Sequence, residues 1–304
     1  MANLSVNIGK LKLKNPVMVA SGTFGYAEEF KDFIDLKKLG AIVTKTITLK
    51  PRKGNSGPRT CETPAGMLNS IGLENPGIER FIVEKLPILK KTGVPAIISI
   101  ASEGPPEEFV ELTRRLDKIK EVSAIELNIS CPNIREKSRL ISQDARATYD
   151  LVKSVRKVTQ KTLITKLSPN VTSVVEIAKA AQDAGSDALS LINTLTGMSI
   201  DVDKRRPKIA SIVAGLSGPA IKPVAVRMCW EVYRAVDLPI IGMGGIMNTE
   251  DALEFLMAGA SAVSIGTGNF INPKASVEII AGLKNYMVKF KINDIKKIVG
   301  SLKT

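Results

Sequence analysis

The sequence predicts an α/β protein, a (β/α)8 TIM barrel with an N-terminal hairpin and long loops at the C-terminal face of the barrel. Three observations lead to this prediction: eight short apolar runs recur along the 304 residues, amphipathic stretches separate them, and no linker divides the chain. Continuously apolar runs are typical of parallel strands that are buried on both faces. We therefore expect residues 1–304 to form one domain, with a two-domain doubly wound arrangement as the alternative.

The expected strands are rich in valine and isoleucine, and amphipathic helices are expected between them. The strands cover residues 17–20, 41–44, 96–100, 124–127, 163–167, 188–192, 240–243 and 262–265. Two helices are clear: residues 171–184, ended by Gly185, and residues 249–258, with Thr249 as the N-cap. Residues 4–13 alternate apolar and polar side chains around Gly9, which predicts a hairpin that caps the bottom of the barrel.

Two connections, residues 47–77 and 194–218, are longer than a barrel needs. Both follow the carboxyl end of an expected strand, which is the face where barrel enzymes build their active sites. Long loops at such a face are usually functional. Polar or glycine residues also follow all eight expected strands, so the sequence predicts a site at this mouth of the barrel.

Composition limits the possible partners and chemistry. The net charge is +13, but basic residues are spread along the chain and only 4% of residues are aromatic, which argues against a nucleic-acid partner. No run approaches the roughly 20 apolar residues that cross a bilayer, and the N-terminus lacks a signal-peptide pattern, so we expect a cytoplasmic protein without a membrane partner.

The chain has three cysteines and no histidine. This content gives no disulfide framework and no metal site. A general base near neutral pH must then be a cysteine, a perturbed carboxylate or lysine, or a tyrosine. Cys131 starts a loop on the active face, before Pro132, and is the candidate base, although a lone cysteine is more often inert. Cys229 lies in a helical stretch and is expected in the core.

Glycines and lysines at the strand ends suggest an anionic ligand. Gly244 and Gly245 follow the seventh strand, and Gly266 and Thr267 follow the eighth, where barrels hold phosphate groups on backbone N–H groups. Tight turns are the alternative reading. Lys45 and Lys166 are expected to point into the mouth and pair with anions, unless they are solvated rim residues. The amides of Asn69, Asn128 and Asn193 suit a planar ligand with imide donors and carbonyl acceptors.

Taken together, these motifs resemble the class 1 dihydroorotate dehydrogenases over nearly the whole chain. Each motif alone is weak evidence, whereas their order and spacing are specific. The motifs are residues 20–22 (ASG), 44–46 (TKT), 66–77 (GMLNSIGLENPG), 126–133 (ELNISCPN), 166–170 (KLSPN), 192–195 (INTL), 215–223 (GLSGPAIKP) and 242–246 (GMGGI).

The resemblance implies one FMN per chain, oxidation of dihydroorotate to orotate in pyrimidine biosynthesis, and Cys131 as the base that removes the C5 proton while a hydride passes from C6 to the flavin. The implied cofactor-binding residues are Ser21, Lys45, Thr46, Ser99, Asn128, Lys166, Ile192, Gly218, Gly244, Gly245, Gly266 and Thr267. The implied substrate-binding residues are Lys45, Asn69, Ser70, Ile71, Gly72, Leu73, Asn128, Asn193 and Thr194.

Residues 192–198 and 215–223 look like the class 1B form. That form implies an electron-transfer partner subunit that carries FAD and a [2Fe-2S] cluster and passes electrons to NAD, with a homodimer core inside a heterotetramer. Two features depart from the family pattern: Ser99 stands where an asparagine is usual, and the loop after Cys131 lacks the usual glycines.

Two other functions compete with this reading. A tRNA-dihydrouridine synthase is also an FMN barrel with an Asn-x-x-Cys-Pro step, but residues 69–77 and the short stretch after the last strand argue against it. A scaffold that only binds an anion would leave Cys131, Lys166 and Asn193 as coincidences.

Overall fold

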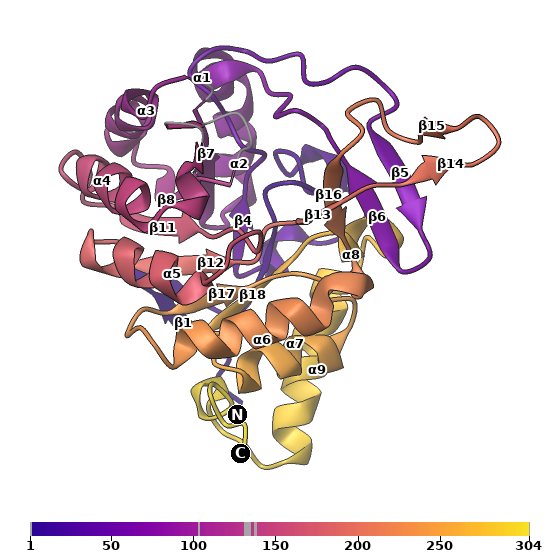
Figure 1. The fold of residues 1–304 in the computed structure, drawn as a ribbon. Helices are drawn as coiled ribbons and strands as arrows, with labels where there is room; N and C mark the ends of the chain where they lie inside the picture. Colours follow the sequence, from indigo (N-terminus) through magenta and orange to yellow (C-terminus); the bar gives the residue numbers. More distant parts are fainter. Residues whose placement is uncertain (1, 103, 131–134, 137–138, 304) are drawn as a thin grey trace.

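The structure, a computed structural model, describes residues 2–102, 104–130, 135–136 and 139–303. Eight parallel strands form a closed barrel, and β18 pairs with β3 to complete it. Helices surround the barrel (Figure 1). The strands, in barrel order, are β3 (Val17–Val19), β4 (Ala41–Val43), β7 (Ala96–Ile100), β8 (Val122–Asn128), β11 (Thr162–Lys166), β12 (Ala188–Leu191), β17 (Ile240–Gly242) and β18 (Ala262–Ile265). Each coincides with one of the eight apolar runs, so the (β/α)8 prediction is confirmed.

Burial on both faces explains why the strand sequences are continuously apolar. Every residue of β3, β4, β7, β11, β12, β17 and β18 is buried. One face lines the barrel interior and the other packs against the helices. Phe255, for example, is fully buried and packs on Gly242 of β17, where an added Cβ would lie 2.5 Å from the ring. Burial of a side chain of this size contributes roughly 1.5–3 kcal/mol.

Helices follow seven of the barrel strands on the outside, while the connection from β3 to β4 holds only short 3-10 turns. The helices are α1 (Gly77–Arg80), continued by a π-helical turn at Phe81–Lys85, α2 (Leu86–Thr92), α3 (Glu107–Asp117), α4 (Ala145–Arg156), α5 (Val174–Asp183), α6 (Lys222–Tyr233), α7 (Thr249–Met257), α8 (Gly268–Ile271) and α9 (Ala275–Lys289). Within the described ranges, none of them has the length and apolar character that a bilayer crossing requires.

The two helices expected over residues 171–184 and 249–258 are confirmed as α5 and α7, but the expected N-cap of the second is wrong. Asn248, and not Thr249, caps α7, because its side chain accepts a hydrogen bond from Asp251 N at 3.1 Å. The Asp251 carboxylate accepts one from Asn248 N in return, which completes a capping box.

The N-terminal hairpin is confirmed. Strands β1 (Val6–Ile8) and β2 (Leu11–Leu13) pair antiparallel. Lys10 N donates a hydrogen bond to Thr162 Oγ1 at 3.1 Å, and Thr162 is the first residue of β11. The hairpin therefore lies against the amino-terminal end of the barrel, opposite the mouth.

The two long connections contain more regular structure than the loops that the sequence predicts. Four strands, β5 (Thr60–Thr63), β6 (Gly66–Asn69), β13 (Leu195–Gly197) and β16 (Ala214–Ser217), form a sheet in the order β13-β16-β6-β5. The hairpin of β14 (Ile200–Asp201) and β15 (Arg206–Pro207) extends from this sheet away from the barrel (Figure 1). The sheet stands beside the mouth and forms a wall of the site.

Candidate active site

Two adjoining cavities occupy the mouth of the barrel. Cavity A has a volume of about 440 Å³ and is lined by the strand ends of β8 and β11 and by residues 69–73. Cavity B has a volume of about 220 Å³ and is lined by the glycines that follow β17 and β18. The residues shared by both cavities are Gly22, Asn69, Ile71, Lys166, Asn193 and Thr194. Such a double cavity can hold two ligands in contact with each other.

The structure brings almost all of the predicted site residues to these two cavities. The predicted residues that line cavity A but not cavity B are Ser21, Lys45, Thr46, Ser70, Gly72, Leu73 and Asn128. The predicted residues that line cavity B but not cavity A are Ile192, Gly218, Gly244, Gly245, Gly266 and Thr267. Cys131 lies outside the described residues. Its neighbour Ser130 lines cavity A, and the Ser130 hydroxyl donates to the Lys166 carbonyl at 3.3 Å.

Two lysines give cavity A its charge. Lys166 is only 5% exposed, and its ammonium group donates to Ser21 Oγ at 3.3 Å. The pKa of Lys45 is lowered, chiefly because burial removes water from the ammonium group. The negative charge of Glu74 raises this pKa, whereas the positive charges of Arg59 and Lys166 lower it. A carboxylate ligand would relieve this crowding of positive charge.

Asn128 offers cavity A a buried acceptor. Its Nδ2 donates to Thr46 Oγ1 at 3.3 Å, whereas its Oδ1 is buried and has no partner in the part of the chain that the structure describes. An orphaned carbonyl oxygen beside a cavity is satisfied when a ligand donates to it. Ser99, predicted as a direct contact, lies behind this pair: it is fully buried, and its hydroxyl is 2.9 Å from Thr46 Oγ1.

Residues 69–73 form one wall of cavity A, and the preceding segment holds them in place. Asn55 donates from its side chain to the carbonyl and hydroxyl oxygens of Ser70, at 3.1 and 2.8 Å. Gly72 has φ +75°, and a Cβ there would lie 2.5 Å from Asn55 Oδ1, so this position requires glycine. Arg59 and Glu74 form an ion pair at 2.5 Å at the rim. These contacts hold the loop in place.

Several residues that line cavity A were not among the predicted site residues, among them Asn55, Gln143 and Asn170. Asn170 donates from Nδ2 to the Thr194 carbonyl at 3.0 Å and accepts from Thr196 N at 2.9 Å, which links the ends of β11 and β12. Its place in residues 166–170, directly after a strand, was a usable signal. For Asn55 the length of its loop was the only signal.

Cavity B has a glycine cradle. Gly244 and Gly245 have φ +125° and +77°, and a Cβ on Gly245 would lie 2.7 Å from Lys222 Cβ. Only glycine fits this backbone, which leaves the chain open to close approach by a ligand. On the other side, Thr267 Oγ1 donates to Ser217 Oγ at 2.8 Å. Successive backbone N–H groups in such turns suit phosphate oxygens.

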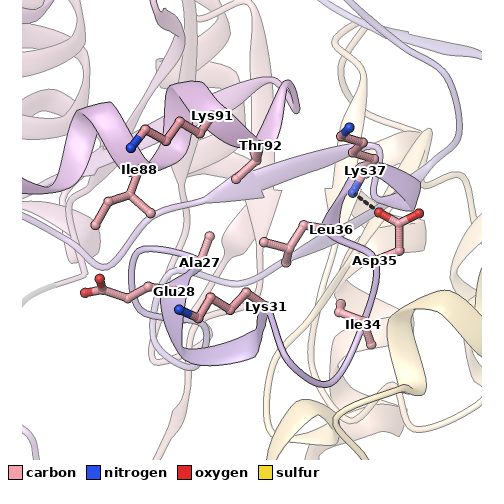
Figure 2. A pocket seen from close by; sticks show the side chains of 10 residues that line it. All are labelled: Ala27, Glu28, Lys31, Ile34, Asp35, Leu36, Lys37, Ile88, Lys91 and Thr92. Atoms are coloured by element: carbon pink, nitrogen blue, oxygen red, sulfur yellow. Dashed lines mark hydrogen bonds between the residues drawn. The ribbon is translucent and has the colours of Figure 1, made fainter.

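A third cavity lies outside the barrel, between α2 and residues 27–37 (Figure 2). Lys31, Lys37 and Lys91 line it but belong to its exposed rim. Lys37 N donates to Asp35 Oδ1 at 3.1 Å, which caps a short 3-10 turn. No barrel strand contributes to this cavity among the described residues, so we do not assign it to the active site.

The remaining described cysteines have no place in the site. Cys229 is fully buried in α6, as expected, and burial raises the pKa of its thiol to about 12. Cys61 lies in β5 and is half-buried. In the described part of the chain, no group of three or more histidine, cysteine or acidic side chains is placed to hold a metal ion.

Comparisons with known proteins agree with this geometry. The family model described as dihydroorotate dehydrogenase matches residues 3–287. The chain is 55% identical over 299 residues to a protein of Trichlorobacter lovleyi, covering 98% of both chains. It is 54% identical to proteins of Geotalea uraniireducens and Thermoanaerobacter pseudethanolicus, covering 99% of each pair. All three relatives are named dihydroorotate dehydrogenase B (NAD(+)), catalytic subunit. This chain belongs to the dihydroorotate dehydrogenase family.

Proposed function

We propose that this chain oxidises dihydroorotate to orotate with FMN as its resident cofactor, as a step of pyrimidine biosynthesis. The observation that carries the proposal is the pair of adjoining cavities that share Lys166, one with a glycine cradle and the other with Lys45 and Asn128. A phosphorylated, flat cofactor fits the first, and a small planar carboxylate fits the second.

FMN in cavity B would have its phosphate on the backbone of Gly244, Gly245, Gly266 and Thr267, with Ile192 and Gly218 beside the ring system. Its ring system would extend into cavity A, where Ser21, Thr46 and Asn128 would contact its polar edge, with Ser99 acting through Thr46. FMN supplies the hydride acceptor. Lys166 would stabilise the negative charge that collects at the pyrimidine end on reduction.

Dihydroorotate in cavity A would pair its carboxylate with Lys45 and its imide groups with Asn69, Asn128 and Asn193. Ser70, Ile71, Gly72, Leu73 and Thr194 would close the cavity around it. Asn128 Oδ1 would gain the donor that it otherwise lacks. Cys131 would act as the base that takes the C5 proton, because the chain has no histidine for this task.

The electrons would leave through a partner. The relatives are named catalytic subunits of an NAD(+) enzyme, which supports a partner subunit for this chain as well. A [2Fe-2S] cluster needs four protein ligands. With three cysteines and no histidine, this chain would leave the cluster and FAD to the partner. We further propose a homodimer core within a heterotetramer in the cytoplasm.

Anaerobic titration tests the proposed function. The purified chain should be yellow from FMN, and dihydroorotate added without oxygen should bleach it and release orotate. A protein that bleaches only with NADPH and is reoxidised by tRNA would instead be a dihydrouridine synthase. A colourless protein that takes up no FMN would contradict both.

The cradle itself gives a second prediction. A Cβ on Gly266 would meet only Ala20 Cβ, at 3.8 Å, so the methyl group would stand in cavity B without straining the fold. Gly266→Ala should therefore keep the wild-type melting temperature but bind FMN about 5- to 150-fold more weakly, because overpacking typically costs 1–3 kcal/mol. Fluorescence titration of the apoprotein with FMN measures this.

Gly93→Ala is the matched control, since Gly93 ends α2 away from both cavities and a Cβ there meets nothing within 4 Å. Because φ is +66° at Gly93, a side chain there should lower the stability of the folded protein, but the affinity for FMN should not change. Equal FMN affinities in Gly266→Ala and wild type would place the phosphate elsewhere.

A further inference from the structure

One buried ionisable group, Glu126 in β8, has no task in the proposed function. It is 1% exposed, and its Oε2 accepts a hydrogen bond from Ser190 Oγ at 3.0 Å. Its Oε1 is buried and has no hydrogen-bond partner in the described part of the chain. A carboxylate held by one hydroxyl is costly to bury unless a positive charge compensates it.

Strand register places Glu126 inside the barrel, below the mouth. Asn128 lines cavity A, and Glu126 precedes it by two residues on the same strand, so both side chains face inward. Strand β11 lies between β8 and β12 in the barrel. The Glu126–Ser190 hydrogen bond therefore crosses the inner face of β11.

Lys166 is the residue of β11 next to this crossing. It pairs with Asn128 on one side and with Ser190 on the other, whereas Glu126 pairs with Ile164, one inward-facing step lower. Lys166 also points inward, because it lines both cavities. The Glu126 backbone thus lies one inward-facing step beneath Lys166, and its carboxylate reaches Ser190, the register partner of Lys166.

Among the residues that the structure describes, Glu126 and Lys166 are buried charged side chains that form no close ion pair. Among the described residues, Lys166 is the one buried cationic side chain, and Glu126 and Asp251 are the buried carboxylates. Asp251, in the first turn of α7, is compensated by its own ion pair with Lys222 at 2.7 Å. This leaves Glu126 as the buried counter-charge of Lys166, in an interior where charges interact over longer distances than in water.

We propose that Glu126 is a positioning residue that acts through Lys166: its negative charge offsets the ammonium group and so sets the reduction potential of the bound FMN. The inference rests on the proposed function. Reduction adds negative charge near Lys166. Without Glu126, the positive charge of Lys166 would stabilise reduced FMN more strongly. The negative charge of Glu126 weakens this stabilisation, so reduced FMN can pass its electrons on more readily.

Glu126→Gln tests the inference, because glutamine keeps the size and can still accept from Ser190. The two-electron midpoint potential of bound FMN should rise by about 30 mV or more, which is a tenfold change in the ratio of reduced to oxidised cofactor. By linkage, reduced FMN should bind the apoprotein at least about tenfold tighter relative to oxidised FMN than in wild type.

Two further variants separate charge from packing. Ser190→Ala removes the hydrogen bond but keeps the charge, so its potential should move less than that of Glu126→Gln. In a Lys166→Met background, Glu126→Gln should have little effect on the potential, because the residue it acts through is gone. The double variant also lacks both buried charges, so it should fold even where Glu126→Gln alone does not.

A Glu126→Gln protein that folds and binds FMN with an unchanged potential would overturn the inference. So would an equal shift in the Lys166→Met background, which would mean that Glu126 does not act through Lys166. Either result leaves the proposed function intact as long as dihydroorotate still bleaches the flavin. A chain that takes up no FMN fails the proposed function instead.

Discussion

Replacement of Cys131 by serine should slow the reduction of bound FMN by dihydroorotate by about 10²–10⁴-fold, the usual contribution of a general base. A serine hydroxyl has nearly the same size as the thiol but ionises far less readily, and no histidine exists in this chain to take over. FMN should remain bound, since the cradle lies on other strands. Anaerobic stopped-flow spectroscopy of flavin bleaching measures the rate.

The chain offers a matched control for this variant. Cys61 is half-buried in β5, and its sulfur contacts the backbone carbonyl of Glu62. Cys61→Ser should leave the rate of flavin reduction unchanged. Loss of FMN from Cys131→Ser would show that Cys131 is structural, and a wild-type rate in that variant would remove it from the chemistry altogether.

The barrel could be predicted from sequence because its signals are local. Each strand is a short, mainly apolar run of three to seven residues, and α5 and α7 carry amphipathic faces with glycine at their ends. Those candidate site residues that directly follow the strands could be found from the same signals, because in a closed parallel barrel all strand ends meet at one mouth. Lys166, Asn128 and Gly244 are far apart in sequence and yet line one site.

The wall of the site could not be predicted in this way, because its strands depend on distant partners. Strand β16 lies between β13 and β6, and Gly215 pairs with Asn69 across almost half of the chain. Strands of two to four residues with mixed polarity carry little periodicity. Ser99 shows a similar limit: its sequence position suggested a direct contact, but the structure puts Thr46 in front of it.

Lys45→Met should weaken orotate binding by about 10- to 150-fold, which corresponds to the 1.5–3 kcal/mol of a hydrogen bond to a charged group. The same substitution should stabilise the apoprotein. The pKa of Lys45 is lowered chiefly by burial, so its charged form is disfavoured in the folded state. If Lys45 had a merely structural role, its replacement would lower the stability of the apoprotein. Calorimetric titration with orotate and thermal unfolding of the apoprotein measure the two effects.

The lowered pKa of Lys45 also fixes the sign of the pH dependence. Orotate binding needs the ammonium form, so in wild type it should be complete below the pKa of Lys45 in the free enzyme. It should then weaken as pH rises through that pKa, and the loss should begin below the ordinary value of 10.5. The folded apoprotein binds fewer protons than the unfolded chain between these two pKa values, so its stability should increase with pH there. Lys45→Arg stays charged throughout. It should abolish the alkaline loss of orotate binding, whereas the same loss in that variant would assign the titration to another group.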